Sequence, residues 1–261
     1  MDTRHHLFYG YEICLDYVGT GMKAMALRSD RTGAVWLIFI SLAYVQSVLF
    51  LHHGLSIDAK ISNAFFDFTC QSENARACWL LDKTDKRLTF FLHDLPIHIF
   101  TGLGIFALCG LLASFKFGNL KKYRELAILI LAGLIFVPGT VAVLKSVTGH
   151  YCPGQLAAYK GILGKASGVR PYPACFPAAF PAAGFGLLVL YFGSSSPLWR
   201  RVGLTCGLGL GGISSIIQIA RGEHYFSHCI ATLLTALFIG TVVLTIKKYL
   251  QVRLTATGEA G

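Results

Sequence analysis

Five basic or imidazole side chains lie at the ends of long apolar stretches, where they can bind and attack an oxyanion. They are Lys145, Arg170, Arg221, His224 and His228. A guanidinium group binds two phosphate oxygens at once, and a lysine supplies a point charge. A histidine in that field can attack phosphorus and carry the phosphoryl group. A helix starting at the last apolar stretch would add the attraction of its N-terminal N–H groups. These residue types therefore indicate a phosphate site.

Two other interpretations of the same side chains stay open. A single Lys or Arg at a membrane interface commonly extends toward lipid headgroups without any part in catalysis. His224 and His228 are four residues apart, so on a helix they share a face and fit two metal ligands. The sequence has no HExxH pattern and offers no evident third ligand, so we expect no metal and no other cofactor.

The elements that must position these residues are apolar helices. The chain of 261 residues is 54% apolar and 14% charged, with a mean hydropathy of +0.58. Soluble domains carry about 25% charged residues, and this composition also excludes a disordered chain and a small disulfide-rich secreted fold. Six charge-free windows are long enough to cross a bilayer at about 1.5 Å per residue. They are 32–57, 95–115, 126–144, 171–199, 202–220 and 224–246, with the fourth helix expected to begin near Pro177. The expected fold is all-α, a polytopic membrane protein with a bundle of six transmembrane helices.

The Lys and Arg residues indicate how these six helices cross the membrane. They gather in 1–33, 116–124, 194–202 and the last residues of the chain. With six spans these segments share one face, which the positive-inside rule makes cytoplasmic. We expect a cytoplasmic N-terminal segment 1–33, a six-helix transmembrane domain 34–247 and a cytoplasmic tail 248–261. The candidate phosphate-binding residues then lie on the opposite face. Because the basic residues are scattered around membrane spans, nucleic-acid binding is not expected.

Four cysteines fall on that opposite face. Cys70 and Cys78 lie in its first loop, and Cys152 and Cys175 lie in its second. If this face is oxidising, two disulfides are possible, and the first would close a small surface loop. Cys152 and Cys175 could equally be free thiols near the site.

Three segments resemble the signature of the type 2 phosphatidic acid phosphatase family, which comprises membrane-bound lipid phosphate phosphatases and phosphotransferases. The family signature is KxxxxxxRP, PSGH and SRxxxxxHxxxD. The corresponding segments here are KSVTGHYCP at 145–153, CFPAAFPA at 175–182 and ARGEHYFSHCIAT at 220–232. They are most similar to a bacterial branch with the motifs CFPAGH and RGxHxxSHxxxT. The resemblance covers roughly residues 55–245. It implies a six-helix bundle in the bacterial inner (cytoplasmic) membrane, with its site facing the periplasm.

The resemblance also assigns a role to each matching residue. Lys145 and Arg221 would hold the phosphate, and His228 would be the nucleophile that forms a phosphohistidine. Thr232 takes the place of the aspartate that normally orients this histidine, and His224 would lie beside the site. The implied substrate is a lipid phosphate or diphosphate within the membrane, with polyprenyl diphosphate as one candidate.

Two positions depart from the family pattern. Cys152 stands where the family has an arginine, so we expect Arg170 to supply the missing charge. Phe180 stands where the family has the histidine that protonates the leaving group, and Phe cannot donate a proton. Losing a general acid typically costs 10²–10⁴-fold in rate.

Three consequences of Phe180 stay open. His150 or His224 could donate the proton instead. Alternatively, the substrate could be a lipid diphosphate, whose phosphate leaving group is weakly basic and needs no acid. Finally, the chain could be a catalytically silent homologue that binds phospholipid headgroups or a membrane partner.

Overall fold

A computed structural model describes residues 56–161 and 174–256 of the chain, and its regular elements are helices. Within these two ranges the only β pairing is an antiparallel bridge between Phe66 and Trp79. The helices are α2 (Ile57–Ala64), η2 (Ala75–Cys78), α3 (Lys86–Thr89), η3 (Phe90–Asp94), α4 (Leu95–Lys116), η4 (Gly118–Tyr123), α5 (Arg124–Thr148), η5 (Pro153–Gln155), η6 (Ala157–Tyr159), α6 (Ala182–Gly186), α7 (Leu188–Gly193), α8 (Pro197–Ala220) and α9 (Phe226–Ala256). The all-α prediction is therefore confirmed for the described residues.

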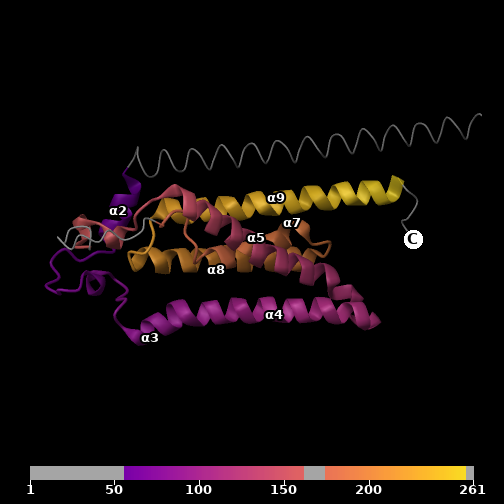
Figure 1. Ribbon diagram of the computed structural model, residues 1–261, viewed down its shortest axis with the longest axis horizontal. Coiled ribbons are helices and arrows are strands. Elements are labelled where there is room, and N and C mark those ends of the chain that lie inside the picture. Colours follow the sequence, from indigo (N-terminus) through magenta and orange to yellow (C-terminus); the bar gives the residue numbers. More distant parts are fainter. Residues whose placement is uncertain (1–55, 162–173, 257–261) are drawn as a thin grey trace, which may run out of the picture.

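Four of these helical stretches are long and apolar enough to cross a membrane, and they contain α4, α5, α8 and α9. They run side by side along the longest axis of the molecule (Figure 1). Each begins and ends near the boundaries of a charge-free window, because a charge is costly inside hydrocarbon. A multi-pass membrane protein is the architecture that these helices indicate.

The fourth charge-free window, 171–199, differs from the prediction. It forms two short helices, α6 and α7, which together cover Ala182–Gly193 and about 18 Å at 1.5 Å per residue. This is shorter than the roughly 30 Å hydrocarbon core. The first predicted span, 32–57, lies almost wholly outside the described residues, as does the predicted segment 1–33. The last helix continues to Ala256, so most of the predicted tail 248–261 extends α9.

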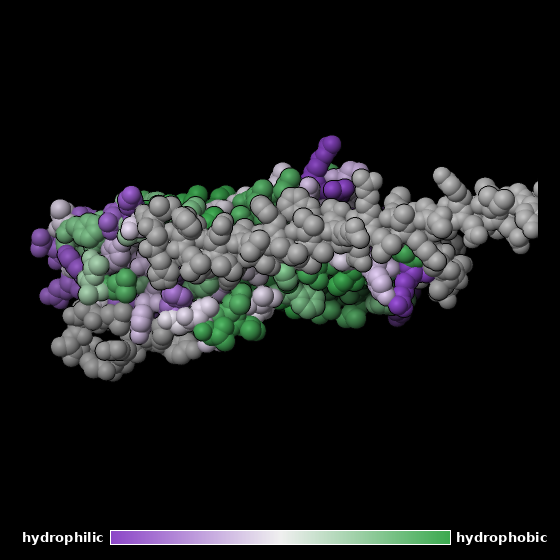
Figure 2. Space-filling view, turned by 90° about the horizontal axis from the view of Figure 1, so that it is seen from above, coloured by the Kyte–Doolittle hydropathy of each residue, from purple (hydrophilic) through white to green (hydrophobic). Residues whose placement is uncertain are grey.

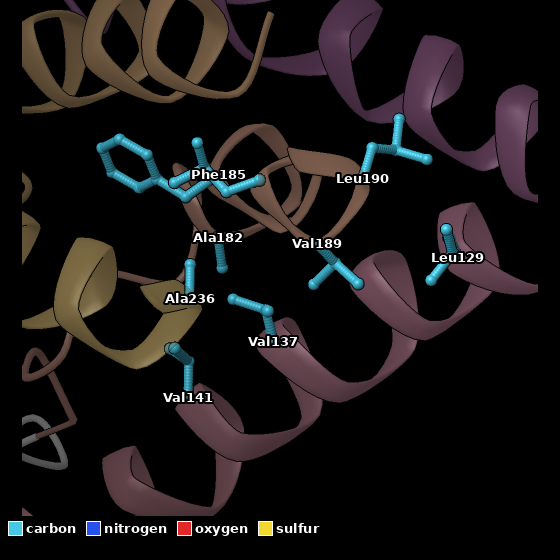
Figure 3. Packing of buried hydrophobic residues seen from close by; sticks show 9 residues of the cluster. Leu129, Val137, Val141, Ala182, Phe185, Val189, Leu190 and Ala236 are labelled. Carbon is cyan, nitrogen blue, oxygen red and sulfur yellow. The ribbon is translucent and has the colours of Figure 1, made fainter. Parts of the chain in front are cut away.

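The pair α6–α7 forms the centre of the bundle. It contacts α5, α8 and α9, and its side chains are almost all buried. Figure 3 shows Val137 of α5 and Ala236 of α9 converging near Ala182 of α6, and Val189 of α7 belongs to the same buried cluster. Gly133 of α5 and Gly186 of α6 let the two backbones touch, because a Cβ atom on either would overlap the other's carbonyl group. Small residues at such contacts allow close packing of membrane helices.

One end of the bundle, which we call the basic end, joins three of the segments rich in Lys and Arg. Lys247 Nζ near the end of α9 lies 2.6 Å from Glu125 Oε1 of α5 and 2.7 Å from Ser195 Oγ, which precedes α8. Hydrophilic side chains gather toward both ends of the molecule, with apolar surface between them (Figure 2). The predicted common face is thus seen for the 116–124, 194–202 and C-terminal segments.

The opposite end, the site end, carries α2, α3 and the connecting loops (Figure 1). An aromatic cluster of Phe66, Trp79 and Tyr159 joins the first loop to the second, with ring centroids 5.1 to 5.3 Å apart. Disulfides link Cys70 to Cys78 and Cys152 to Cys175. Of the two states left open for Cys152 and Cys175, the structure has the bonded one.

Candidate functional site

A cavity of about 730 Å³ brings Lys145 and His224 together at the site end. Lys145 comes from the last turn of α5, and His224 from the turn that joins α8 to α9. Glu223, Gln218 and His93 line the same cavity. Its polar lining is therefore built from three parts of the chain that are distant in sequence, around residues 93, 145 and 218–224.

We call this whole cavity the apolar groove, because the rest of its lining is almost wholly hydrocarbon. It extends between α4 and α5 and is closed on one side by the segment that enters α6. Its apolar lining consists of Pro96, Ile97, Phe100, Gly104, Ile105, Leu108, Leu131, Leu134, Ile135, Pro138, Ala179, Phe180 and Ala183, with Thr101 among them. A groove of this kind fits the chain of an amphiphile whose polar head lies at Lys145 and His224.

His224 is held as a neutral imidazole. Its side chain is only 6% exposed, and burial together with the charge of Lys145 lowers the pKa of His224 to about 3. Its Nδ1 lies 3.3 Å from Cys175 Sγ. Because Cys175 is in a disulfide, this sulfur has no proton to give, so Nδ1 must be the donor. The lone pair of the neutral ring is therefore on Nε2.

His228 lies in the first turn of α9, behind His224. It is 1% exposed and lines neither of the two cavities described here. Four rings surround it, with centroid distances of 5.1 Å to Phe176, 5.2 Å to Tyr225, 6.0 Å to His224 and 6.3 Å to His150. The structure thus brings the three predicted histidines together, but only His224 reaches the apolar groove.

Thr232 lies one turn further along α9. Its hydroxyl donates to the carbonyl oxygens of Ala178 at 2.7 Å and of His228 at 3.0 Å. The hydroxyl proton is therefore used on the backbone, where it ties α9 to the segment before α6. This contact fixes the position of the two motifs relative to each other.

The start of α9 is also held from α2. Buried Asp58 accepts hydrogen bonds from the Ser227 backbone N–H at 2.8 Å and from the Ser227 hydroxyl at 2.5 Å. A carboxylate at a helix N-terminus satisfies N–H groups that have no partner within the helix and interacts favourably with its dipole. Asp58 therefore fixes the turn that carries His224.

Arg221 follows the last residue of α8 and lines a second cavity, of about 330 Å³, rather than the apolar groove. Its side chain is 3% exposed, and Nη2 donates to Thr89 Oγ1 at 3.1 Å. Within the described ranges, neither Nε nor Nη1 of Arg221 has a hydrogen-bond partner. Burial lowers the pKa of Arg221, and the nearby charge of Asp94 opposes that shift. Lys145 and Arg221, which we expect to hold one phosphate, line two cavities that share Glu223.

Gly222 makes this turn possible. Its φ is +67°, and a Cβ atom there would overlap the Trp79 ring. Its carbonyl oxygen accepts from the Gly154 N–H at 2.9 Å. Only glycine fits both the left-handed backbone and the close contact, so this residue fixes the directions of Arg221 and Glu223 on either side.

The second cavity, which we call the basic pocket, collects positive charge. Arg76, Lys83, Lys160 and Arg221 line it, and Glu223 is the acidic residue of its lining. Lys83 forms an ion pair with Glu223. Burial, with the charges of Arg76 and Arg221, lowers the pKa of Lys83 to about 8. Four cations against one carboxylate leave the pocket strongly positive.

Phe180 lines the apolar groove, and a histidine from η3 stacks on it. The rings of His93 and Phe180 are 5.0 Å apart at centroid and 13° from parallel. His93 Nδ1 lies 2.9 Å from Asp94 Oδ1. Sequence motifs gave no sign of His93, because it lies in η3, far in sequence from the three matching segments.

Gln218 is a second residue that the motif search did not find. It is 3% exposed, lines the apolar groove, and its Nε2 has no hydrogen-bond partner among the described residues. A buried amide without a partner costs free energy, so an anion at this position would satisfy it. The only sequence signal was its location at the end of an apolar window.

Arg170 lies outside the described residues. The backbone carbonyl of His150 accepts a hydrogen bond from the Cys175 N–H at 2.8 Å.

Ligand atoms of Cys152, Cys175 and His224 lie within 4.8 Å of one another. Metal binding by cysteine requires a thiolate, and these two sulfurs are bonded to each other. In this state the cluster does not fit a metal ion.

Comparisons of the chain with protein-family models, with curated proteins and with solved structures found no match.

Proposed function

We propose that this protein removes or transfers the phosphoryl group of a lipid phosphate or diphosphate at the outer face of a bacterial inner membrane. The observation that carries the proposal is the apolar groove that ends at a cation and a buried, neutral imidazole. The groove accommodates a lipid chain, and Lys145 attracts its phosphate. The motif resemblance supports the same chemistry.

His224 is the nucleophile that the geometry favours. Motif correspondence alone favours His228, but His228 lies behind His224 and outside the apolar groove. A nucleophilic histidine must present an unprotonated nitrogen to phosphorus. The Nε2 lone pair of His224 meets that need, while the His228 ring packs against it and limits its orientation.

Phosphoryl transfer then proceeds in two steps. In the first, His224 Nε2 forms a bond to phosphorus while the bond from phosphorus to the leaving oxygen breaks. Lys145 Nζ and Gln218 Nε2 bind the other phosphate oxygens, whose charge they stabilise. In the second, water attacks the phosphohistidine, the nitrogen–phosphorus bond breaks and phosphate leaves.

His93 is our candidate for the proton donor that Phe180 cannot be. Asp94 accepts a hydrogen bond from Nδ1–H. In the imidazolium form of His93, which the Asp94 carboxylate stabilises, Nε2 carries a second proton and donates it to the leaving oxygen. In the second step His93 Nε2 takes one proton from the attacking water, so the cycle is balanced. The stacked Phe180 ring holds the imidazole flat at the side of the groove. This assignment replaces the earlier alternatives, His150 and His224.

Phosphate release by purified protein in mixed micelles tests the proposal, with phosphatidic acid and polyprenyl diphosphate as substrates. His224→Asn should abolish release, by roughly 10⁴-fold or more, whereas His228→Asn should retain part of it. His98→Asn is a matched control, because His98 is exposed on α4 and does not line the groove. Release unaffected by His224→Asn would refute the proposal.

A catalytically silent homologue is the second candidate function. The replacement of the family's acid by Phe180 is the observation that favours it. In that case folded wild-type protein would bind phosphatidic acid and release no phosphate from either substrate.

A further inference from the structure

We propose that the basic pocket is a second anion site, which binds a phosphate or diphosphate group separately from the apolar groove. It does not depend on the hydrolysis proposed above. The site would bind such a group whether or not His224 reacts with lipid.

Arg221 gives the strongest support for this site. It is buried, yet its Nε and Nη1 atoms have no hydrogen-bond partner within the described residues, and the side chain lines the pocket. A buried guanidinium group with unused donors is costly unless an anion completes it. Phosphate oxygens are the acceptors that arginine binds most effectively in proteins.

The arrangement of charge around Arg221 selects the same class of ligand. Lys83 already pairs with Glu223, which is the one carboxylate that the described residues contribute to the pocket lining. Arg76 and Arg221 still repel Lys83 and contribute to its lowered pKa. An anion between these three cations would remove that repulsion. A group with two negative charges would do so more completely than one with a single charge.

The two cavities meet at Glu223, which lines both of them. The polar lining and the size of the basic pocket, about 330 Å³, suit a phosphate or diphosphate with its waters rather than a lipid chain. The anion can be free in solution or part of a lipid headgroup. Both sources present the same phosphate oxygens to Arg221.

Isothermal titration of the full-length protein with inorganic pyrophosphate tests this site. Arg76→Gln combined with Lys83→Gln should weaken binding by roughly tenfold or more, because two of the three cations around the anion are lost. Arg200→Gln with Arg201→Gln is the matched control, since those arginines lie at the start of α8, near the basic end. Equal affinity in all three proteins would overturn the proposal.

Two further variants sharpen the result. Arg221→Gln should abolish pyrophosphate binding, and its circular dichroism spectrum would show whether it folds. If it does not fold, the Arg76 and Lys83 double variant still decides the question. His224→Asn should bind pyrophosphate as the wild type does, and loss of binding there would show that the pocket and the groove are one site. Failed hydrolysis would leave this test unchanged.

The source of the anion can be found with the wild type in nanodiscs. If a lipid headgroup is the ligand, pyrophosphate should bind more weakly in nanodiscs with phosphatidic acid than in those of phosphatidylcholine alone. Equal binding in both supports a free anion.

Discussion

The apolar groove and the basic pocket share Glu223, but their linings are of opposite kinds. The groove is bounded by hydrocarbon along α4 and α5 and has polar groups only at one end, whereas the pocket is polar and lined by four cations. Among the described residues, Lys145 is the lysine or arginine that lines the groove. The two cavities therefore differ in how much positive charge surrounds a bound group. A single cation beside a neutral histidine suits a reaction, and a cluster of cations suits binding.

The largest effect that should separate the two cavities comes from His93. His93→Asn should lower phosphate release from phosphatidic acid by about 10²–10⁴-fold, because an alkoxide leaving group needs a proton. Release from polyprenyl diphosphate should fall less, because its phosphate leaving group is weakly basic and only the second step, in which His93 accepts a proton from water, is affected. Initial rates on the two lipids measure this, with pyrophosphate binding unchanged. An equal loss on both lipids would make His93 a residue that shapes the groove instead.

Lys145 should have the next largest effect, again confined to the groove. Lys145→Gln should reduce phosphate release by about 10²–10³-fold, which is typical for loss of one group that stabilises transition-state charge. Pyrophosphate titration of the same variant should match the wild type, since Lys145 does not line the basic pocket. A parallel loss of pyrophosphate affinity would contradict the separation of the two sites.

Filling the groove should give a smaller effect that depends on lipid length. Gly104 lines the groove, and a Cβ atom there would make only ordinary contact with Leu134. Gly104→Phe should therefore fold and raise KM for a long-chain lipid phosphate by roughly tenfold or more, with little change for a short-chain one. Gly110→Phe, on the same helix but in open space, is the control. The same KM change for both chain lengths would count against the groove as the lipid site.

The smallest effect is the pH dependence, in which the two cavities should differ. The pKa of Lys83 is about 8, so the basic pocket loses charge as pH rises from 7 to 9, and its pyrophosphate affinity should fall a few-fold. Lys83→Arg keeps its charge and should remove that fall. The pKa of His224 is about 3, so lowering pH from 7 to 5 leaves this nucleophile neutral. The neutral fraction of a histidine with an ordinary pKa would fall about 25-fold over that range. Pyrophosphate affinity measured from pH 7 to 9, and phosphate release measured from pH 7 to 5, check these two expectations.

Much of the bundle could be predicted from charge alone. The windows that became α4, α5, α8 and α9 were found because a run of about 20 uncharged residues has few uses outside a bilayer. The same rule placed Lys145 and His224 at one end, and the structure joins them in one cavity. Both disulfide pairings were also within reach of sequence reasoning, since each pair lies in one loop.

The rest depended on contacts that no local pattern records. Hydropathy alone does not separate a buried core helix from a membrane-spanning one. The charge-free window that contains α6 and α7 therefore predicts a full transmembrane helix. His93 reaches Phe180 only because η3 leads into α4 beside α6. The direction of Arg221 depends on the left-handed turn at Gly222, and motif spacing says nothing about that.

The short central pair α6–α7 has a consequence for how the protein is made. As the chain leaves the ribosome, a segment of about 18 Å cannot settle in the bilayer by itself. It can be buried only against another helix. Because Gly186 of α6 contacts Gly133 of α5, and α5 is synthesised earlier, α5 can be the first helix against which it packs. Assembly of the membrane domain would then be sequential, with α8 and α9 closing around a hairpin formed during synthesis.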